Sequence, residues 1–141
     1  MTEHSADSSC IFCAIIAGRA PARFIYEVDD ACAFLDANPL RLGHTLVVPR
    51  RHVRDLLDEG AAEPLAAIGP ALHRTALLLK DGLVADGISV LQANGAAAGQ
   101  TVFHLHFHLL PRPANDVPLT DWTPNLTARE SLPETHHTLT S

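Results

Sequence analysis

The chain has 141 residues, of which 47% are hydrophobic and 18% are charged. This is the size and composition of one folded domain, and it excludes a chain that is disordered throughout. The formal net charge of −6 disfavours a binder of duplex nucleic acid, because such proteins present a basic surface to the phosphates. Three cysteines are too few for a disulfide scaffold and suit a reducing compartment.

Neither a secretory signal nor a membrane span is evident in the sequence. The polar start has no basic n-region, and the apolar run that follows it, from Ile11 to Ala17, is short. No stretch of about 18 apolar residues occurs. We therefore expect a cytoplasmic protein with no membrane partner.

The first half of the chain predicts a short helix and three strands. Residues 1–9 are small and polar, which indicates a flexible N-terminus. Apolar residues recur at helical spacing over residues 10–20, where Gly18 fits a helix C-terminus and Pro21 stops the element. Extended runs at residues 23–28 and 31–36 predict a hairpin, and residues 45–48 predict a further strand.

The second half predicts helices followed by strands. Leucine and alanine recur at helical spacing from residue 53 to 85, which indicates a short helix and then a longer one. Pro64 fits a first helical turn, whereas Pro70 predicts a break or kink. Residues 88–93 and 101–110 are strand candidates on either side of a glycine-containing loop. Residues from about 125 onward are expected to be poorly ordered.

Strands, then helices, then strands predict an α+β fold with an antiparallel sheet. We expect about five strands, one long helix and a short N-terminal helix. The expected folded domain covers residues 10–115, between the flexible residues 1–9 and a partly disordered C-terminal extension at residues 116–141.

The most informative segment is the run from His104 to Leu110, in which histidine alternates with an apolar residue three times. On a strand, successive side chains face opposite sides, so the rings of His104, His106 and His108 share one face. Two chemistries fit such a face. The imidazoles could bind a metal ion, or one neutral imidazole could attack phosphorus and form a covalent intermediate.

The chain resembles the histidine triad (HIT) superfamily of nucleotide hydrolases and transferases, and is most similar to its nucleotide-binding (HINT-like) branch and bacterial relatives. The triad itself carries this resemblance, together with four further segments in the family's order: residues 10–16, 33–39, 43–52 and 94–104. The uridylyltransferase branch has glutamine at the third triad position, so His108 favours a hydrolase.

The resemblance implies roles for three histidines. His106 would be the nucleophile at the α-phosphorus of a nucleotide, and His108 would donate a hydrogen bond to a phosphate oxygen. His44 would support the phosphate or the nucleophile from across the site. The reaction would need no catalytic metal. Lone His73 is expected to be structural or exposed, and His136 and His137 in the tail are expected to have no role.

The resemblance also implies a nucleotide-binding site. Asp36 would accept hydrogen bonds from the ribose hydroxyls, as a carboxylate does in dinucleotide sites. The other expected contacts are phosphate or leaving-group partners and an apolar wall around the base, namely Asn94, Gln100, Thr101, Phe12, Ile16, Phe34 and Leu35. Ordinary core packing is an alternative for Phe34 and Leu35.

Cys10 and Cys13 have the spacing of half a zinc site. Some HIT relatives supply two further ligands from positions that correspond to His52 and His104. Such a four-ligand site has no open position, so its zinc would be structural. The alternative is two free thiols at a helix N-terminus.

By resemblance the protein is a homodimer that hydrolyses purine nucleoside phosphoramidates, with dinucleoside polyphosphates as the second substrate class. Two alternatives remain: a nucleotide-binding regulatory module with little turnover, and a metal-dependent hydrolase that uses the three triad histidines as ligands. The segment from Arg112 to Asp116 departs from the ending of the nucleotide-binding branch, where this segment influences the choice of leaving group. Trp122, further along the chain, is a candidate contact to substrate or partner subunit, with packing against its own domain as the alternative.

Overall fold

The computed structural model describes residues 7 and 9–141. The predicted flexible N-terminus, residues 1–9, therefore lies almost wholly outside the described residues. Five strands form one antiparallel sheet in the order β1-β2-β3-β5-β4. Their bounds are β1 Phe24–Glu27, β2 Ala31–Leu35, β3 Thr45–Pro49, β4 Gly87–Leu91 and β5 Phe107–Arg112. The predicted α+β class and antiparallel sheet are thus confirmed.

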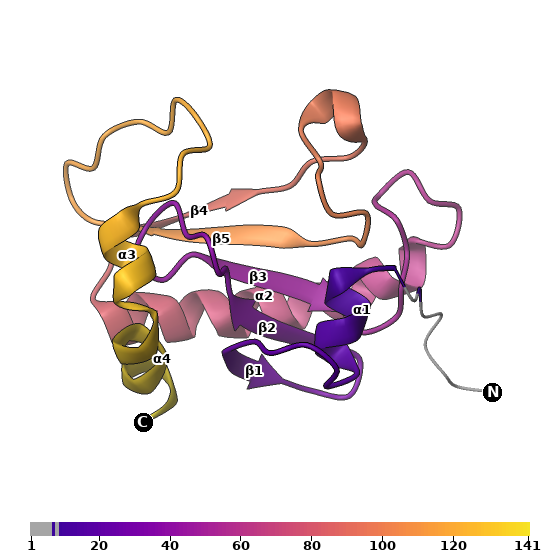
Figure 1. Cartoon of the computed structure of the whole chain (residues 1–141), viewed down its shortest axis with the longest axis horizontal. Helices are drawn as coiled ribbons and strands as arrows, with labels where there is room; N and C mark the ends of the chain where they lie inside the picture. Colours follow the sequence, from indigo (N-terminus) through magenta and orange to yellow (C-terminus); the bar gives the residue numbers. More distant parts are fainter. Residues whose placement is uncertain (1–6, 8) are drawn as a thin grey trace.

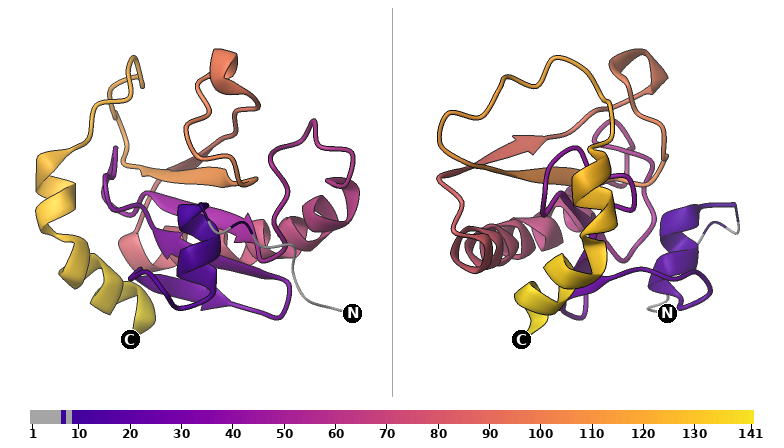
Figure 2. Two further views of the ribbon diagram at one scale, coloured as in Figure 1. Left: turned by 45° about the vertical axis from the view of Figure 1, so that its right-hand side comes forward. Right: turned by 60° about the vertical axis from the view of Figure 1, so that its left-hand side comes forward.

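Two helices cover opposite faces of this sheet (Figures 1 and 2). The short helix α1, Ile11–Ile16, packs against the apolar side chains of Cys32, Phe34 and Leu46. The long helix α2, Ala62–Leu83, packs against the side chains that alternate with these, such as Ala33 and Val47. This alternation is the period of two that a strand imposes when both of its faces are buried.

The predicted break at Pro70 is wrong, because α2 runs continuously from Ala62 to Leu83. Pro70 removes only the backbone donor that would reach Ala66, and both residues lie on the exposed side of the helix. Water can therefore satisfy the freed carbonyl group. The short helix expected after residue 53 is also absent from the described chain, and turns occupy residues 55–60.

The last strand starts later than predicted, at Phe107 instead of residue 101. Before that point the backbone follows the neighbouring loop, because the Leu105 N–H donates to the Val53 carbonyl oxygen at 2.8 Å. His104 and His106 therefore precede the strand, and only His108 of the triad lies within it.

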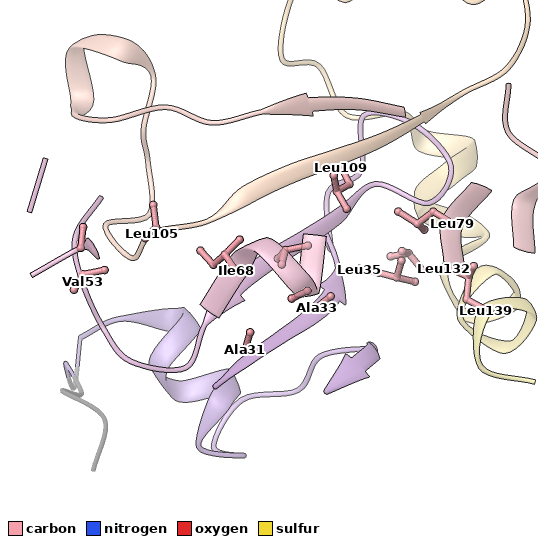
Figure 3. Close-up of a cluster of buried hydrophobic side chains, with 13 residues drawn as sticks. Ala31, Ala33, Leu35, Val53, Ile68, Leu79, Leu105, Leu109, Leu132 and Leu139 are labelled. Atoms are coloured by element: carbon pink, nitrogen blue, oxygen red, sulfur yellow. The ribbon is translucent and has the colours of Figure 1, made fainter. Parts of the chain in front are cut away.

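The expectation of a poorly ordered tail is also wrong. Two helices, α3 Leu126–Glu130 and α4 Leu132–Thr140, follow the loop at residues 113–125. Leu132 and Leu139 join the core between α2 and the sheet, near Leu79 (Figure 3). The Asn125 side chain caps α3 by accepting from Ala128 N–H at 3.0 Å. His136, expected to have no role, hydrogen-bonds the Phe24 carbonyl oxygen through Nε2 at 2.9 Å.

A short 3₁₀ helix, η1 Ala96–Ala98, lies in the loop between β4 and β5. Among the described residues, no helix is both long and apolar enough to cross a bilayer.

Candidate active site and metal centre

A cavity of about 770 Å³ opens on the α1 side of the sheet. Helix α1 and strand β2 contribute apolar side chains such as Phe12 and Phe34 to its wall, and His106 and His108 contribute polar ones. It is lined by seven of the predicted nucleotide-site residues: Phe12, Phe34, Leu35, Asp36, Thr101, His106 and His108. The size suits a nucleotide, since small-molecule sites in proteins commonly hold about 300–1,000 Å³.

A chain of hydrogen bonds fixes the tautomers of His44 and His108. The backbone N–H of Leu40 donates to His44 Nδ1 at 3.0 Å, so this nitrogen carries a lone pair. The proton of His44 is then on Nε2, which lies 2.9 Å from His108 Nδ1 and donates to it. The remaining proton of His108 is therefore on Nε2, where it is free to donate to a ligand.

The electrostatic environment keeps this chain neutral. Burial, followed by the proximity of His108 and then His106, lowers the pKa of His44 to about 3. Burial and the neighbouring His106 lower the pKa of His108 to about 4. At neutral pH both rings are uncharged, and each keeps one donor and one acceptor nitrogen.

His106 has the opposite tautomer from His108. Its Nδ1 lies 2.6 Å from the backbone carbonyl oxygen of His104, which can only accept, so the proton of the ring is on Nδ1. Nε2 of His106 therefore carries a lone pair. Burial lowers the pKa of this ring as well. The His106 and His108 rings stand edge to face with centroids 4.9 Å apart, so a nucleophilic nitrogen and a hydrogen-bond donor lie side by side at the cavity.

Asp36 lies where β2 ends and borders both the cavity and the histidines. Its Oδ1 accepts from the Asn38 N–H at 2.8 Å, which holds the carboxylate in place. Its Oδ2 lies 3.5 Å from His44 Nε2. Burial raises the pKa of this carboxyl group. Asp36 contacts His44, and His44 contacts His108, so a carboxylate acceptor lies near the free donor of His108.

Besides His44, which reaches the site through His108, three predicted site residues do not line the cavity. The Asn94 side chain accepts from the Leu56 N–H at 2.8 Å and exchanges hydrogen bonds with Gln92. Gln100 donates to the Arg54 carbonyl oxygen and accepts from the Gly95 N–H. Both amides thus tie neighbouring loops together. Ile16 packs against the α1 core cluster and is not among the lining residues.

Trp122, which the sequence left open as a contact to substrate, to a partner subunit or to its own domain, lies at the cavity. Its ring stands edge to face on His108, with centroids 5.0 Å apart, and lines the cavity. The loop that carries it is held by Asp116, which pairs with both Arg41 and Arg112. A single tryptophan in a proline-rich segment was a signal in the sequence, but its distance from the triad along the chain hid the contact.

The four predicted metal ligands meet at the other side of α1. Nδ1 of His52 and Nδ1 of His104 are 3.1 Å apart, and the Cys13 Sγ lies 3.3 and 3.5 Å from them. The Cys10 Sγ lies 3.6 Å from His104 Nδ1. Around a tetrahedral zinc ion, bonds of about 2.0–2.3 Å separate the ligand atoms by roughly 3.3–3.8 Å. The donor set and its spacing therefore fit zinc.

The second hydrogen bond of His104 supports this assignment. Its Nε2 lies 2.8 Å from the Pro49 carbonyl oxygen, so the ring proton is there and Nδ1 presents its lone pair to the cluster. Metal-bound histidines commonly have such a partner, which fixes the tautomer. Four protein ligands leave no open coordination position, as in structural zinc sites.

The structure does not bring the three triad histidines to a single metal ion. His104 belongs to the cysteine cluster, whereas His106 and His108 line the cavity. Asp36, His44 and His108 also lie within reach of one another. A metal ion there would require a lone pair on His44 Nε2 while the Leu40 N–H already occupies Nδ1, and a neutral imidazole has only one free lone pair.

The HIT domain family matches residues 17–115 of the chain. The chain belongs to this family. A HIT-like protein of Methanocaldococcus jannaschii is 44% identical over 107 residues, which cover 76% of this chain and 81% of the relative. An adenylylsulfatase of Arabidopsis thaliana is 37% identical over 109 residues, which cover 77% of this chain and 55% of the relative.

Solved structures of HIT proteins have the same fold. A Hit-like protein from Bartonella henselae has a TM-score of 0.80 and 37% identity, and the match covers 96% of this chain and 97% of that one. A zinc-bound histidine triad protein from Mycobacterium smegmatis has a TM-score of 0.78 and 38% identity, covering 93% of each chain. This HIT protein therefore belongs to a family whose members include a hypothetical histidine triad nucleotide-binding protein from Sulfolobus tokodaii and a HIT family hydrolase from Clostridium thermocellum.

Proposed function

We propose that this HIT protein hydrolyses purine nucleotide conjugates at the α-phosphate through a nucleotidyl-His106 intermediate. The observation that carries the proposal is the pair of opposite tautomers at the cavity. His106 Nε2 has its lone pair free because Nδ1 is held by the His104 carbonyl oxygen. His108 Nε2 has its proton free because Nδ1 accepts from His44. A nucleophile and a hydrogen-bond donor to the phosphate are thus fixed before substrate binds.

The reaction takes two displacements at phosphorus. In the first, His106 Nε2 forms a bond to the α-phosphorus, and the bond to the leaving amine breaks as the amine gains a proton from water. In the second, water attacks phosphorus, the bond to His106 Nε2 breaks to restore its lone pair, and the nucleoside monophosphate leaves, while the proton lost by the attacking water neutralises the hydroxide left by the first step. His108 Nε2–H donates to a phosphate oxygen in both steps, where charge accumulates in the transition state.

The remaining cavity residues supply binding. Asp36 accepts from the ribose hydroxyls, and Thr101 contacts the phosphate. The apolar wall that includes Phe12, Phe34 and Leu35 holds the base. Adenosine phosphoramidates are the first substrate choice and dinucleoside polyphosphates the second. The name of the adenylylsulfatase relative supports an adenylyl group as the part held in the cavity.

Cys10, Cys13, His52 and His104 would hold a structural zinc ion, and the zinc-bound M. smegmatis relative supports this choice of metal. The ion would supply a fixed cross-link between α1 and the sheet, without contact to the reacting atoms. The homodimer that the family resemblance implies is part of the same proposal, and sedimentation equilibrium measures it directly.

The His106→Ala variant tests the proposed nucleophile. We expect its kcat with an adenosine phosphoramidate to fall by at least about 10³-fold, while AMP affinity remains close to that of the wild type. The matched control is His73→Ala, which removes an exposed histidine of α2. Turnover by His106→Ala at the wild-type rate would contradict the proposal. A wild-type protein that binds AMP tightly but does not turn over substrate would favour a nucleotide-binding module.

A further inference from the structure

Helix α1 belongs to both the metal cluster and the nucleotide cavity. Cys10 and Cys13 face the cluster, whereas Ile11, Phe12 and Ile15 line the cavity. The helix has only six residues. Isolated helices shorter than about 12 residues are marginal in water, so the position of α1 depends on what anchors it.

Phe12 lies between the two cysteines in sequence and reaches the proposed nucleophile. Its ring stands edge to face on His106, with centroids 5.1 Å apart and an interplanar angle of 88°. Its ring centroid also lies 5.9 Å from that of His104 and 5.5 Å from that of Phe34. Any shift of α1 would therefore change the packing around the His106 ring.

His104 makes a second connection between the two sites. Its ring presents Nδ1 to the cluster, where it lies 3.1 Å from His52 Nδ1. Its backbone carbonyl oxygen accepts the Nδ1 proton of His106 at 2.6 Å. A ligand bond at the ring would hold the residue whose carbonyl group fixes the nucleophile's tautomer.

We propose that the metal cluster is energetically coupled to the nucleotide cavity, with Phe12 and His104 as the positioning residues that connect them. A metal ion at the cluster fixes both residues against His106, and a nucleotide in the cavity tightens the metal in return. The proposal rests on the proposed function for the identity of the cavity's ligand. Coupling between two sites is reciprocal, so each ligand changes the affinity of the other by the same factor.

Zinc affinity with and without AMP tests this coupling. A chromophoric chelator competes for zinc with the wild-type protein, first alone and then with AMP at saturation. We expect AMP to tighten zinc by at least about fivefold, and zinc to tighten AMP by the same factor. AMP should also slow the transfer of zinc from the loaded protein to excess chelator, a readout that does not require the metal-free protein to fold.

Four variants separate coupling from a merely structural metal. Phe12→Leu keeps α1 apolar and all four ligands, and we expect zinc affinity without AMP to be retained while the effect of AMP shrinks. His104→Cys retains a fourth ligand of a kind that zinc accepts, and should rescue the coupling that His104→Ala loses. His73→Ala, which removes an exposed histidine of α2 outside both sites, should behave as the wild type.

The outcomes distinguish this proposal from the proposed function. Equal AMP affinity in loaded and metal-free protein, or a rate of zinc transfer unchanged by AMP, would overturn the coupling alone. Failure of AMP to bind the zinc-loaded protein would overturn both. A Phe12→Leu variant with the full effect of AMP would remove Phe12 from the connection.

Discussion

The histidines of this chain differ in tautomer because each has a different hydrogen-bond partner. His106 donates from Nδ1 to a backbone carbonyl oxygen, whereas His108 accepts at Nδ1 from His44. His104 donates from Nε2 to the Pro49 carbonyl oxygen and turns Nδ1 toward the cysteines. The residue pattern could indicate a shared chemistry, but the tautomers depend on backbone groups that no motif specifies.

Asp36→Asn tests the ribose assignment. An asparagine side chain has one acceptor oxygen, whereas an aspartate has two. At this position the Asn38 N–H already occupies one acceptor oxygen. We expect kcat/KM for a ribonucleotide substrate to fall by about 10- to 100-fold, since hydrogen bonds to charged groups contribute about 1.5–3 kcal/mol. The loss for the 2′-deoxy substrate should be smaller. The control is Asp29→Asn in the exposed β1–β2 turn, and equal losses on both substrates would contradict the assignment.

At the scale of elements, the sequence predicted those helices and strands that depend on residues within their own segment. The sequence predicted the β1–β2 hairpin, strand β3 and the short helix α1. Each of these segments carries its own signal, namely the spacing of its apolar residues or its turn residues. Gly18 has a φ of +79°, as its predicted place at the end of α1 requires. The errors arose where distant contacts decide. The segment before β5 binds a neighbouring loop, and the tail gains its order from α2 and β1.

Leu139→Ala tests whether the C-terminal helix is part of the core. Leu139 is 5% exposed and packs so closely on α2 that a Cβ at Gly82 would approach its Cδ2 to 2.8 Å. We expect the free energy of unfolding to fall by about 2–4 kcal/mol in denaturant titrations, as for buried leucines elsewhere. Leu126→Ala in α3, where the residue is 66% exposed, should change it by less than about 0.5 kcal/mol. Equal small effects would indicate a tail that does not contribute to the core.

For the whole molecule, neutral buried histidines make stability depend on pH. The pKa of His44 is lowered to about 3 and that of His108 to about 4, both below the ordinary value of 6.5. Below pH 6.5 the unfolded chain therefore binds more protons than the folded chain. Stability then falls as the pH falls toward these folded pKa values, and the loss is absent at neutral pH.

His44→Gln measures the contribution of one of these rings. Between pH 6 and about pH 4.5, the wild type should lose up to about 1.4 kcal/mol more per pH unit than the variant, because one proton fewer is taken up on unfolding. Denaturant titrations across this range give both slopes. Parallel slopes would mean that His44 is already charged in the folded chain.

The covalent intermediate is the central claim, and intact mass spectrometry tests it most directly. The protein is mixed with an adenosine phosphoramidate, quenched with base within one turnover, and weighed beside His106→Ala. We predict that the wild type gains the mass of one adenylyl group and that the variant gains none. Release of AMP at the wild-type rate with no adduct at any quench time, or an adduct of equal yield on His106→Ala, would contradict the assignment of His106 as the nucleophile.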